Sequence, residues 1–396
     1  MKHCATRRSF LQALGAGAAA LGLIRPTRAA EKPIQGFEKA PQDPDASKGW
    51  KPVSDRKIRV GIAGYGVCRF GAAFSFQDHP NVQVAAVSDL DPDKCAALAK
   101  ACRCEKTYPS AEEMIRDDSI EAVFVATDAP SHGRLCIEAL RHGKHVASAV
   151  PAVFGSLEEA DRLFEAVKTS GKKYMLFETS YFHTDCHAMR EIYRAGGFGK
   201  LVYSEGEYYH YMPEPIDSYK GWRVGLPPQW YPTHSNAYYV GVTGGSFTEV
   251  SCMGMPSVLG HLQPDNNRYK NPFGTEIALF RTSEGGTARM AVSWDTPGYG
   301  GEMGRIRGQK ASFYGKYEGL EKVPEIKRPP LPPGVEAGGH GGSHGYLMNE
   351  FVMAILEDRK PLVDVAQALN MTVAGIVAHQ SALKDGELLK IPQYRL

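Results

Sequence analysis

Three features are scarce in this chain of 396 residues, and each absence excludes a class of protein. No apolar run reaches the length of a membrane span, so the mature chain is not expected to cross a bilayer. The formal net charge is only +2 and no long basic run follows the N-terminal segment, which excludes nucleic acid as an expected partner. The eight cysteines show no paired C-x-x-C spacing, so we predict no metal centre. One disulfide is compatible with the sequence, but its partners do not follow from it.

The N-terminal segment resembles a twin-arginine export signal. Arg7 and Arg8 precede an Ala- and Gly-rich stretch, Ala13 to Ile24, which is too short and too weakly apolar to span a bilayer. We therefore predict a signal peptide over residues 1–30 and a periplasmic or secreted protein. This pathway exports folded protein, so a cofactor bound in the cytoplasm could leave with the chain. Residues 31–56 are polar and proline-rich and are predicted to be a linker.

The segment from Lys57 to Asp89 has the order of a dinucleotide-binding βαβ unit. An apolar run is followed by the turn Gly64-Tyr65-Gly66, a predicted helix, and a second apolar run that ends at Asp89. Gly64 can adopt a backbone conformation closed to other residues, and Gly66 allows close approach of a pyrophosphate. The carboxylate of Asp89, at the end of the second strand, can accept a hydrogen bond from a ribose 2′-OH. The segment therefore predicts a nucleotide site and favours NAD.

The glycine pattern departs from G-x-G-x-x-G at its third position. Arg69 stands where the third glycine is expected, and Gly71 follows two residues later. A turn that binds nothing is therefore the alternative interpretation. Arg69 also keeps NADP open, because its guanidinium could contact a 2′-phosphate.

Alternating strands and helices continue to residue 177. Asp91, Ser110 and Ser156 are predicted helix N-caps, and short apolar runs are predicted strands over 120–127, 145–150 and 174–177. This order predicts an α/β fold, with a doubly wound parallel Rossmann sheet over residues 57–177. Residues 178–396 contain alternating, tyrosine-rich strands and two C-terminal helices, 346–358 and 364–383. They predict an α+β domain with a large, mainly antiparallel sheet for substrate binding and oligomerisation.

Several motifs together resemble the Gfo/Idh/MocA oxidoreductase family. They are GIAGYG, VSDLDPDK, VATDAPSH, GKHVASAVP, RAGGFGKLVYSEGEYY, EFVMAILEDRKP and AHQSALKDGE. The resemblance covers about residues 57–392 and implies an NAD(P)-dependent enzyme. The open face of the second predicted sheet is of a type that commonly pairs with a copy of itself, so we also predict a homo-oligomer. It implies cofactor contacts at Gly64, Tyr65, Gly66, Val67, Cys68, Arg69, Asp89, Thr127, His132, Ala149, Val150 and Pro151.

The chain lacks one residue that this family uses. A Glu-Lys-Pro sequence usually precedes the second domain, and its lysine assists proton transfer, but Ala149 and Val150 stand at those positions here. His234, in the sequence Tyr231-Pro232-Thr233-His234, is the predicted replacement because imidazole titrates near neutral pH. The family's catalytic histidine also falls in this region. Tyr231 and Tyr181 are its predicted polar partners, although a structural histidine remains the alternative.

Other polar residues are candidates for substrate contact. Glu178, Tyr181 and His183 follow the last predicted parallel strand, where open α/β sheets bind ligands. Trp222 and Arg223, with the tyrosine-rich stretch 208–211, could provide a platform for a sugar. His340 and His344 lie in a Gly-rich loop, and their spacing is too loose to predict a metal site.

The predicted function is an exported oxidoreductase that acts on a sugar, cyclitol or glycoside with firmly bound NAD. ETSY, WR, YPTH and the missing lysine are similar to a second type in the family, the NAD-dependent glycosidases of the α-N-acetylgalactosaminidase kind. That similarity implies transient oxidation at C3 and elimination. A non-catalytic carbohydrate-binding protein is the third possibility.

Overall fold

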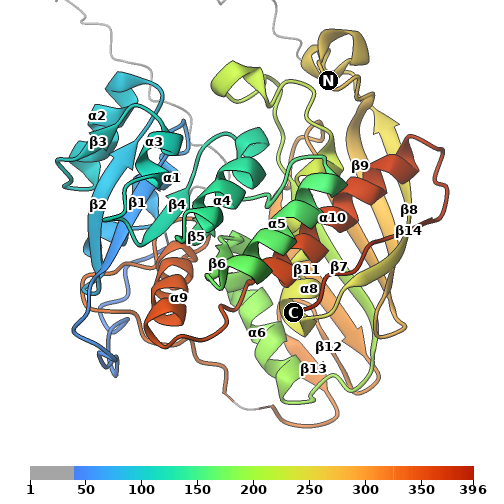
Figure 1. Ribbon diagram of the computed structural model, residues 1–396. Helices are drawn as coiled ribbons and strands as arrows, with labels where there is room; N and C mark the ends of the chain where they lie inside the picture. Colours follow the sequence, from blue (N-terminus) through green and yellow to red (C-terminus); the bar gives the residue numbers. More distant parts are fainter. Residues whose placement is uncertain (1–39, 324) are drawn as a thin grey trace, which may run out of the picture. The chain divides into compact units, whose positions relative to one another are not determined.

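The computed structural model describes residues 40–323 and 325–396, and these belong to one compact unit (Figure 1). The predicted signal peptide, residues 1–30, and the linker residues 31–39 lie outside the described residues. No helix of the described chain is long and apolar enough to cross a membrane. The seven cysteines within the described ranges are free thiols.

The first sheet is parallel throughout and has six strands in the order β3-β2-β1-β4-β5-β6. The order reverses at β1, from which the chain is wound in both directions, as the alternating sequence pattern predicts. β4 is buried at every position, which explains its continuous apolar run. The strands are β1 (Ile58–Ala63), β2 (Val82–Ser88), β3 (Thr107–Tyr108), β4 (Ala122–Val125), β5 (His145–Ser148) and β6 (Tyr174–Leu176).

The helices around this sheet begin at the predicted caps. The Asp91 carboxylate accepts the N–H of Asp93 at 3.0 Å, and Ser110 and Ser156 each accept an N–H three residues later. These bonds satisfy donors that a helix start otherwise leaves without partners. The helices are α2 (Pro92–Ala101), α3 (Ala111–Ile115), α4 (His132–Arg141) and α5 (Leu157–Ser170).

The helix predicted after the glycine turn is much shorter than expected. α1 (Phe70–Ala73) is a single turn, and Arg69 and Ser75 on either side have positive φ values of 51° and 60°. A β-carbon on Gly71 would lie 2.4 Å from the Gly64 carbonyl oxygen and 2.9 Å from Leu98. Gly71 therefore provides the close packing that the third glycine of the motif normally allows, two residues later in the chain.

The second sheet has eight strands in the order β13-β12-β11-β7-β10-β9-β8-β14. Only the β7–β10 pair is parallel, and β9 and β10 form the predicted hairpin. This confirms the predicted mainly antiparallel sheet. Its strands are β7 (Leu201–Tyr209), β8 (Phe247–Pro256), β9 (Phe273–Thr282), β10 (Thr287–Ser293), β11 (Gly301–Gly308), β12 (Ala311–Phe313), β13 (Tyr317–Gly319) and β14 (Leu389–Lys390).

The C-terminal helices return to the first sheet. α10 (Val365–Ala382) is almost entirely buried and packs on both α5 and β8, as Figure 1 shows. α9 (His344–Leu356) brings Phe351 against Phe76 and Phe177, and the Leu176 N–H donates to the Val363 carbonyl. The predicted division at residue 178 did not anticipate this return. Three short helices, α6 (Thr184–Arg194), α7 (Thr233–Asn236) and α8 (Val240–Thr243), complete the fold.

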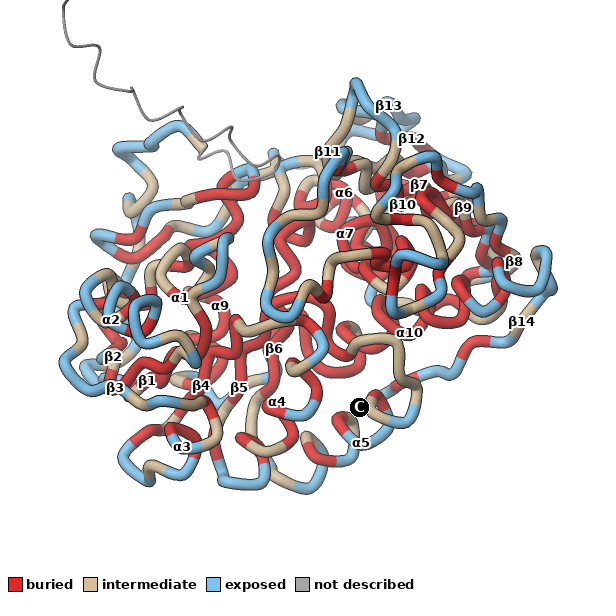
Figure 2. The backbone as a smooth tube through the Cα atoms, turned by 90° about the horizontal axis from the view of Figure 1, so that it is seen from above, coloured by how far each residue is buried: buried red, intermediate tan, exposed pale blue. Residues whose placement is uncertain are grey.

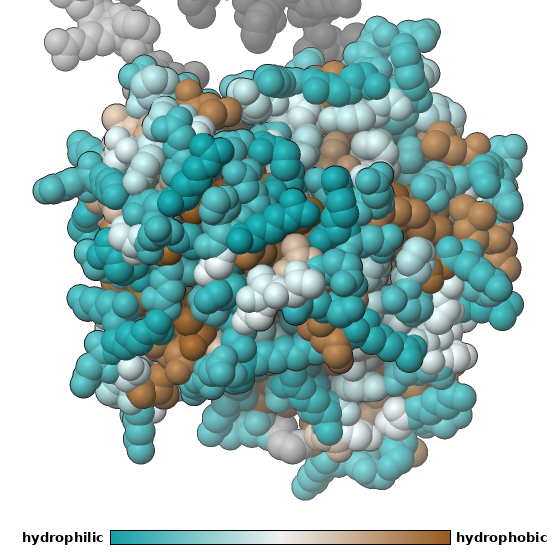
Figure 3. All heavy atoms as spheres, in the orientation of Figure 1, coloured by the Kyte–Doolittle hydropathy of each residue, from teal (hydrophilic) through white to brown (hydrophobic). Residues whose placement is uncertain are grey.

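The buried core is continuous from one sheet to the other. Buried backbone, red in Figure 2, runs from β1 and β4 through β6 to α7 and β10. The face seen in Figure 3 is mainly hydrophilic, with hydrophobic groups in separate patches.

We predict that Gly71→Ala destabilises the fold and that Gly66→Ala does not. The new β-carbon at 71 collides with backbone, whereas one at 66 meets nothing within 4 Å. Overpacking of this kind costs about 1–3 kcal/mol, which lowers the thermal midpoint by several degrees. Calorimetry of the two variants beside the parent chain provides the measurement. Equal midpoints for both variants would contradict the packing role of Gly71.

Candidate active site

A cleft of about 610 Å³ lies at the carboxyl ends of β1, β2, β4 and β5. This edge of an open parallel sheet is where ligands bind in such folds. The structure places every predicted cofactor residue except Pro151 along this cleft. They are Gly64, Tyr65, Gly66, Val67, Cys68, Arg69, Asp89, Thr127, His132, Ala149 and Val150.

The glycine turn fits a dinucleotide. Gly64 has φ of +101°, and a β-carbon there would lie 2.3 Å from the Ala126 carbonyl oxygen, so only glycine is accommodated. The space beside Gly66 is open. Asp89 accepts the N–H groups of Tyr65 at 2.7 Å and Asp91 at 2.9 Å, which fixes its carboxylate at the cleft wall. Arg69 is exposed at the cleft and leaves the turn accessible.

His132 and Pro151 connect two strand ends behind the cleft. Nδ1 of the His132 ring lies 3.0 Å from the Pro151 carbonyl oxygen, and Nε2 lies 3.2 Å from the Thr127 carbonyl oxygen. The ring is buried, and burial lowers its pKa. His132 therefore holds the ends of β4 and β5 in place as well as lining the cleft.

A small inner chamber of about 30 Å³ continues from the cleft. Ala149, Val150, Arg223 and Tyr231 line both spaces, so the chamber is the inner end of the same site. His234 lines only the chamber. Within the described residues no lysine lines it, which agrees with the loss of the family lysine. The remaining lining residues are Cys68, Phe70, Phe74, Phe177, Thr179, Tyr208, His210, Ile216 and His340.

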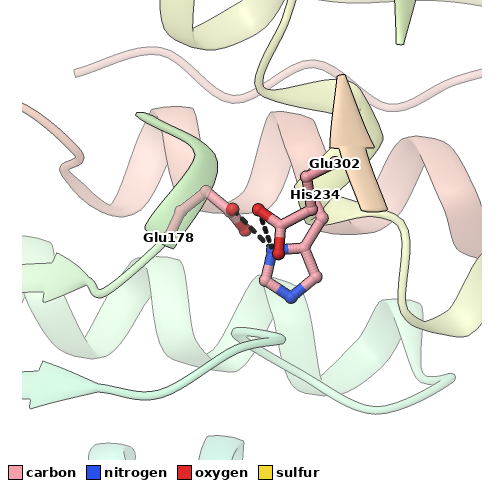
Figure 4. A group of neighbouring side chains, drawn as sticks. All are labelled: Glu178, His234 and Glu302. Atoms are coloured by element: carbon pink, nitrogen blue, oxygen red, sulfur yellow. Dashed lines mark hydrogen bonds and ion pairs between the residues drawn. The ribbon is translucent and has the colours of Figure 1, made fainter. Parts of the chain in front are cut away.

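Two buried glutamates flank His234 (Figure 4). Nδ1 of His234 lies 2.8 Å from Glu178 Oε1 and 3.7 Å from Glu302 Oε2. Glu178 follows β6, Glu302 belongs to β11, and His234 is in the short helix α7, so three distant segments meet here. Glu178 also accepts the Ser180 N–H at 2.9 Å, and Glu302 accepts the Ser180 hydroxyl.

The two carboxylates control the protonation of His234. Burial alone would lower the pKa of this histidine, but the charges of Glu178 and Glu302 raise it to about 9. Burial would raise the pKa of Glu302, yet His234 and His183 lower it to about 2. Near neutral pH the site therefore holds a histidinium between carboxylates, and His234 is a proton donor.

A stacked group of side chains covers the junction of cleft and chamber. The Arg223 guanidinium lies 4.2 Å from the centroid of the Trp222 ring and 5.7 Å from that of Tyr231. The charge of Arg223 opposes the rise in pKa that burial causes in the Tyr231 phenol and in the Cys68 thiol, and all three residues line both the cleft and the chamber. Burial raises the pKa of Tyr231 to about 12 despite Arg223, so the phenol stays protonated. The Tyr231 ring lies 5.6 Å from that of His234.

Three sequence predictions require correction. Tyr181, predicted as a catalytic partner, is buried in the core with the Arg190 guanidinium 3.8 Å from its ring centroid, and it lines neither space. His183, predicted to contact substrate, lines neither space, and its Nε2 lies 3.5 Å from Glu302. Glu178, also predicted to contact substrate, binds His234. Ligands bind at the carboxyl ends of parallel strands, and this segment does lie at such an end. That rule does not predict which way each side chain of the 3₁₀ turn Thr179–Phe182 points.

Sequence reasoning missed Glu302 entirely. Glu302 stands in a Gly-rich strand with no motif around it, and only the pairing of β11 with β7 brings it to His234. The donor atoms of Glu178, His234 and Glu302 lie within 4.8 Å of one another, which is close enough to hold a metal ion. A proton on His234 already balances part of the carboxylate charge, and one nitrogen with two carboxylates does not select a particular metal.

Comparison with known proteins supports the NAD-binding assignment of the parallel-sheet domain. Residues 58–178 match the model of the oxidoreductase family with an NAD-binding Rossmann fold, Gfo/Idh/MocA. A glycosyl hydrolase family 109 protein of Saccharopolyspora erythraea is 24% identical, with 98% of this chain and 94% of the relative covered. A family 109 protein of Bacteroides fragilis is 30% identical over 42% of this chain and 38% of its own.

Solved structures show the same fold. A scyllo-inositol dehydrogenase of Lactobacillus casei matches with a TM-score of 0.66 at 17% identity, over 85% of this chain and 99% of its own. A levoglucosan dehydrogenase in complex with NADH matches with a TM-score of 0.68 at 18% identity, over 86% of this chain and 100% of its own. Residues 58–178 therefore share the NAD-binding Rossmann fold of the Gfo/Idh/MocA oxidoreductase family. This confirms the predicted resemblance, the Rossmann fold and NAD as the cofactor.

We predict that Glu178→Gln lowers the pKa of His234 more than Glu302→Gln does. Glu178 is the nearer carboxylate and the larger contributor, and an amide provides no negative charge. The pKa should fall from about 9 towards the ordinary histidine range in the first variant and less far in the second. NMR titration of labelled histidine, assigned with a His234→Ala spectrum, measures all three values. A wild-type value near 6.5 would refute this electrostatic description.

Proposed function

We propose that this protein is an exported NAD-dependent enzyme that oxidises a hydroxyl-bearing carbon of a sugar, cyclitol or glycoside. The observation that carries the proposal is the position of His234, which is held by Glu178 at the inner end of the dinucleotide cleft. When bound, NAD supplies a hydride acceptor. The residues around the glycine turn would hold its diphosphate, and Asp89 would accept a ribose hydroxyl.

His234 would supply a proton to the substrate. Its Nδ1 is occupied by Glu178, so Nε2 is the nitrogen that can donate to a substrate oxygen in the chamber. Tyr231 and Trp222 place aromatic rings at the entrance, suited to the C–H faces of a sugar ring. Val150 and Ala149 make this inner wall apolar, which limits competition from water.

The second candidate function is redox-neutral glycoside hydrolysis. Two observations favour it: the match to the family 109 protein of Saccharopolyspora erythraea extends over nearly the whole chain, and the chamber holds a protonated histidine beside a protonated tyrosine. In that route the ketone at C3 acidifies the C2 proton, the sugar loses this proton to a base and its aglycone by elimination, water adds to the resulting double bond, and the hydride returns afterwards. His234 would then protonate the departing oxygen.

The twin-arginine pattern at Arg7 and Arg8 supports export. An enzyme outside the cytoplasm has no supply of soluble NAD, so the cofactor would have to stay bound between turnovers. The position of Arg223 supports such retention, because Arg223 lines the cleft together with Cys68 of the glycine turn.

We predict that the purified protein releases NAD on heat denaturation and that His234→Ala abolishes chemistry without loss of this NAD. His234 lines the inner chamber and is absent from the cleft lining. Loss of a general acid lowers turnover by about 10²- to 10⁴-fold. Bound nucleotide is measured by chromatography. Turnover is measured with p-nitrophenyl glycosides and with free sugars as substrates.

The same assay separates the candidate functions. Absorbance of NADH after addition of a free sugar indicates net oxidation, whereas p-nitrophenol release without net NADH indicates the glycosidase. Sugar binding by a protein that contains no nucleotide would identify a carbohydrate-binding protein and refute both enzymatic proposals. Unchanged turnover in His234→Ala would remove this residue from the mechanism.

We predict that Asp89→Asn weakens NAD binding by about 10- to 100-fold, because a hydrogen bond to a charged group contributes about 1.5–3 kcal/mol. Asparagine keeps one oxygen, which can accept the Tyr65 N–H, and loses only the bond from the Asp91 N–H, so the turn should remain folded. Asp93→Asn is the matched control, since Asp93 is on the same segment but does not line the cleft. Calorimetric titration of nucleotide-stripped protein with NAD and NADP gives the affinities. Equal NAD affinity in all three proteins would contradict the ribose contact.

A further inference from the structure

One short segment from the second half of the chain forms part of the wall of the dinucleotide cleft. It comprises residues 217–223, between β7 and α7, and we call it the strap. All of its residues except Gly221 line the cleft: Asp217, Ser218, Tyr219, Lys220, Trp222 and Arg223. Apart from Tyr231, the other described residues that line this cleft all fall between positions 63 and 150. The strap therefore closes a space whose remaining walls come mainly from the parallel-sheet half.

The two ends of the strap differ in how firmly they are held. Trp222 is only 6% exposed, and its ring centroid lies 5.8 Å from that of Phe154 and 6.2 Å from that of Tyr231. Phe154 belongs to the loop after β5, so this contact joins the strap to the parallel sheet. Tyr219, by contrast, is 48% exposed, and Lys220 beside it is also exposed. The strap thus has a packed base at Trp222 and an exposed tip.

Two neighbouring residues outside the cleft hold the backbone of the strap. The Tyr269 hydroxyl donates to the Trp222 carbonyl oxygen at 2.7 Å, and the Arg268 guanidinium donates to the Lys220 carbonyl oxygen. Neither Arg268 nor Tyr269 lines the cleft or the chamber. Both bonds end on backbone carbonyls, so they fix the path of the strap and not the positions of its side chains. We call Arg268 and Tyr269 the latch.

The tip of the strap has a backbone conformation that most residues avoid. Lys220 has φ of +51° and Gly221 has φ of +61°. This left-handed region is open to glycine but unfavourable for a residue with a side chain, such as lysine. A β-carbon on Gly221 would lie 3.6 Å from Val224, an ordinary contact, so the backbone angle rather than space requires glycine there. The closed path of the strap therefore depends on the latch, and loss of the latch favours opening.

We propose that the strap opens to admit and release NAD, and that Arg268 and Tyr269 are the positioning residues that keep it closed. This rests on the proposed function in one respect, the retention of the cofactor between turnovers. The latch bonds join protein groups only to each other, so breaking them favours the open strap with or without nucleotide. The rates of entry and release then rise by the same factor, and the equilibrium affinity for the nucleotide does not change.

Kinetic closure of this kind suits an enzyme that works outside the cytoplasm. A cofactor that is lost there is not replaced, so the rate of release decides how many turnovers the enzyme completes. The closed strap also places Arg223 at the junction of the cleft and the inner chamber. The latch therefore acts on cofactor retention and on the shape of the reaction space together.

The test compares Tyr269→Phe with Tyr317→Phe in the full-length protein. Each variant loses one hydroxyl that donates to a backbone carbonyl, but Tyr317 belongs to β13 and lines neither the cleft nor the chamber. Stopped-flow fluorescence on mixing nucleotide-stripped protein with NADH gives the association rate, and displacement of bound NADH by excess NAD gives the release rate. We expect both rate constants to rise by about two- to tenfold in Tyr269→Phe, the factor that one such hydrogen bond contributes. The ratio of the two constants should stay at the wild-type value, and Tyr317→Phe should leave both constants unchanged.

A second variant, Gly221→Ala, weakens the closed strap without removal of a hydrogen bond. Alanine has room at this position but disfavours φ of +61°. We expect the same paired rise in the association and release rates of NADH. The thermal midpoints of all variants, measured beside the wild type, show that each is folded.

Three outcomes overturn the proposal. They are unchanged rates in either Tyr269→Phe or Gly221→Ala, an equal rise in Tyr317→Phe, and a faster release with a matching loss of affinity, which would mean that the strap binds the nucleotide directly. Release of NADH from the wild type within the time of one turnover overturns a different statement, the cofactor retention in the proposed function. The rates in the variants then still decide whether the strap opens.

Discussion

The structure depends on one buried ion pair, between Glu178 and His234. Burying a carboxylate is expensive unless it is paired and hydrogen-bonded, and Glu178 meets this condition only when α7 is placed against the end of β6. The pair therefore joins the parallel sheet to the second sheet at the centre of the molecule. Glu302 adds a third charge from β11, so the relative position of three segments is fixed by electrostatics as well as by packing.

The sequence was sufficient to predict those parts of the fold that depend on local rules. Asp91, Ser110 and Ser156 cap helices at the predicted positions because capping needs only a side chain and an N–H two or three residues away. Five of the six parallel strands follow from short apolar runs, whereas β3, a two-residue strand, does not. The length of α1 did not follow, because Gly71 packs on the Gly64 carbonyl and on Leu98, and neither contact is visible as a local pattern.

The candidate site was predictable to a lesser degree. The cofactor residues near Gly64 were predicted from a motif and its strand context, and His234 was predicted from the aromatic and polar residues that are consecutive with it in the sequence; the structure places them along the cleft and the chamber. Glu302 has no such neighbours, and its role depends on sheet pairing. Tyr181 was misjudged because adjacent residues of a 3₁₀ turn face different sides, so that one contacts the site and the next is buried beneath it.

The return of the C-terminal segment to the first sheet has a consequence for biosynthesis. Phe351 completes an aromatic cluster with Phe76 and Phe177, and Val363 provides a hydrogen-bond acceptor for the last parallel strand. The nucleotide-binding half therefore cannot finish its core while the ribosome still holds the final tenth of the chain. We expect the nascent protein to remain vulnerable to proteases until translation ends, and to acquire its cofactor only as a completed polypeptide.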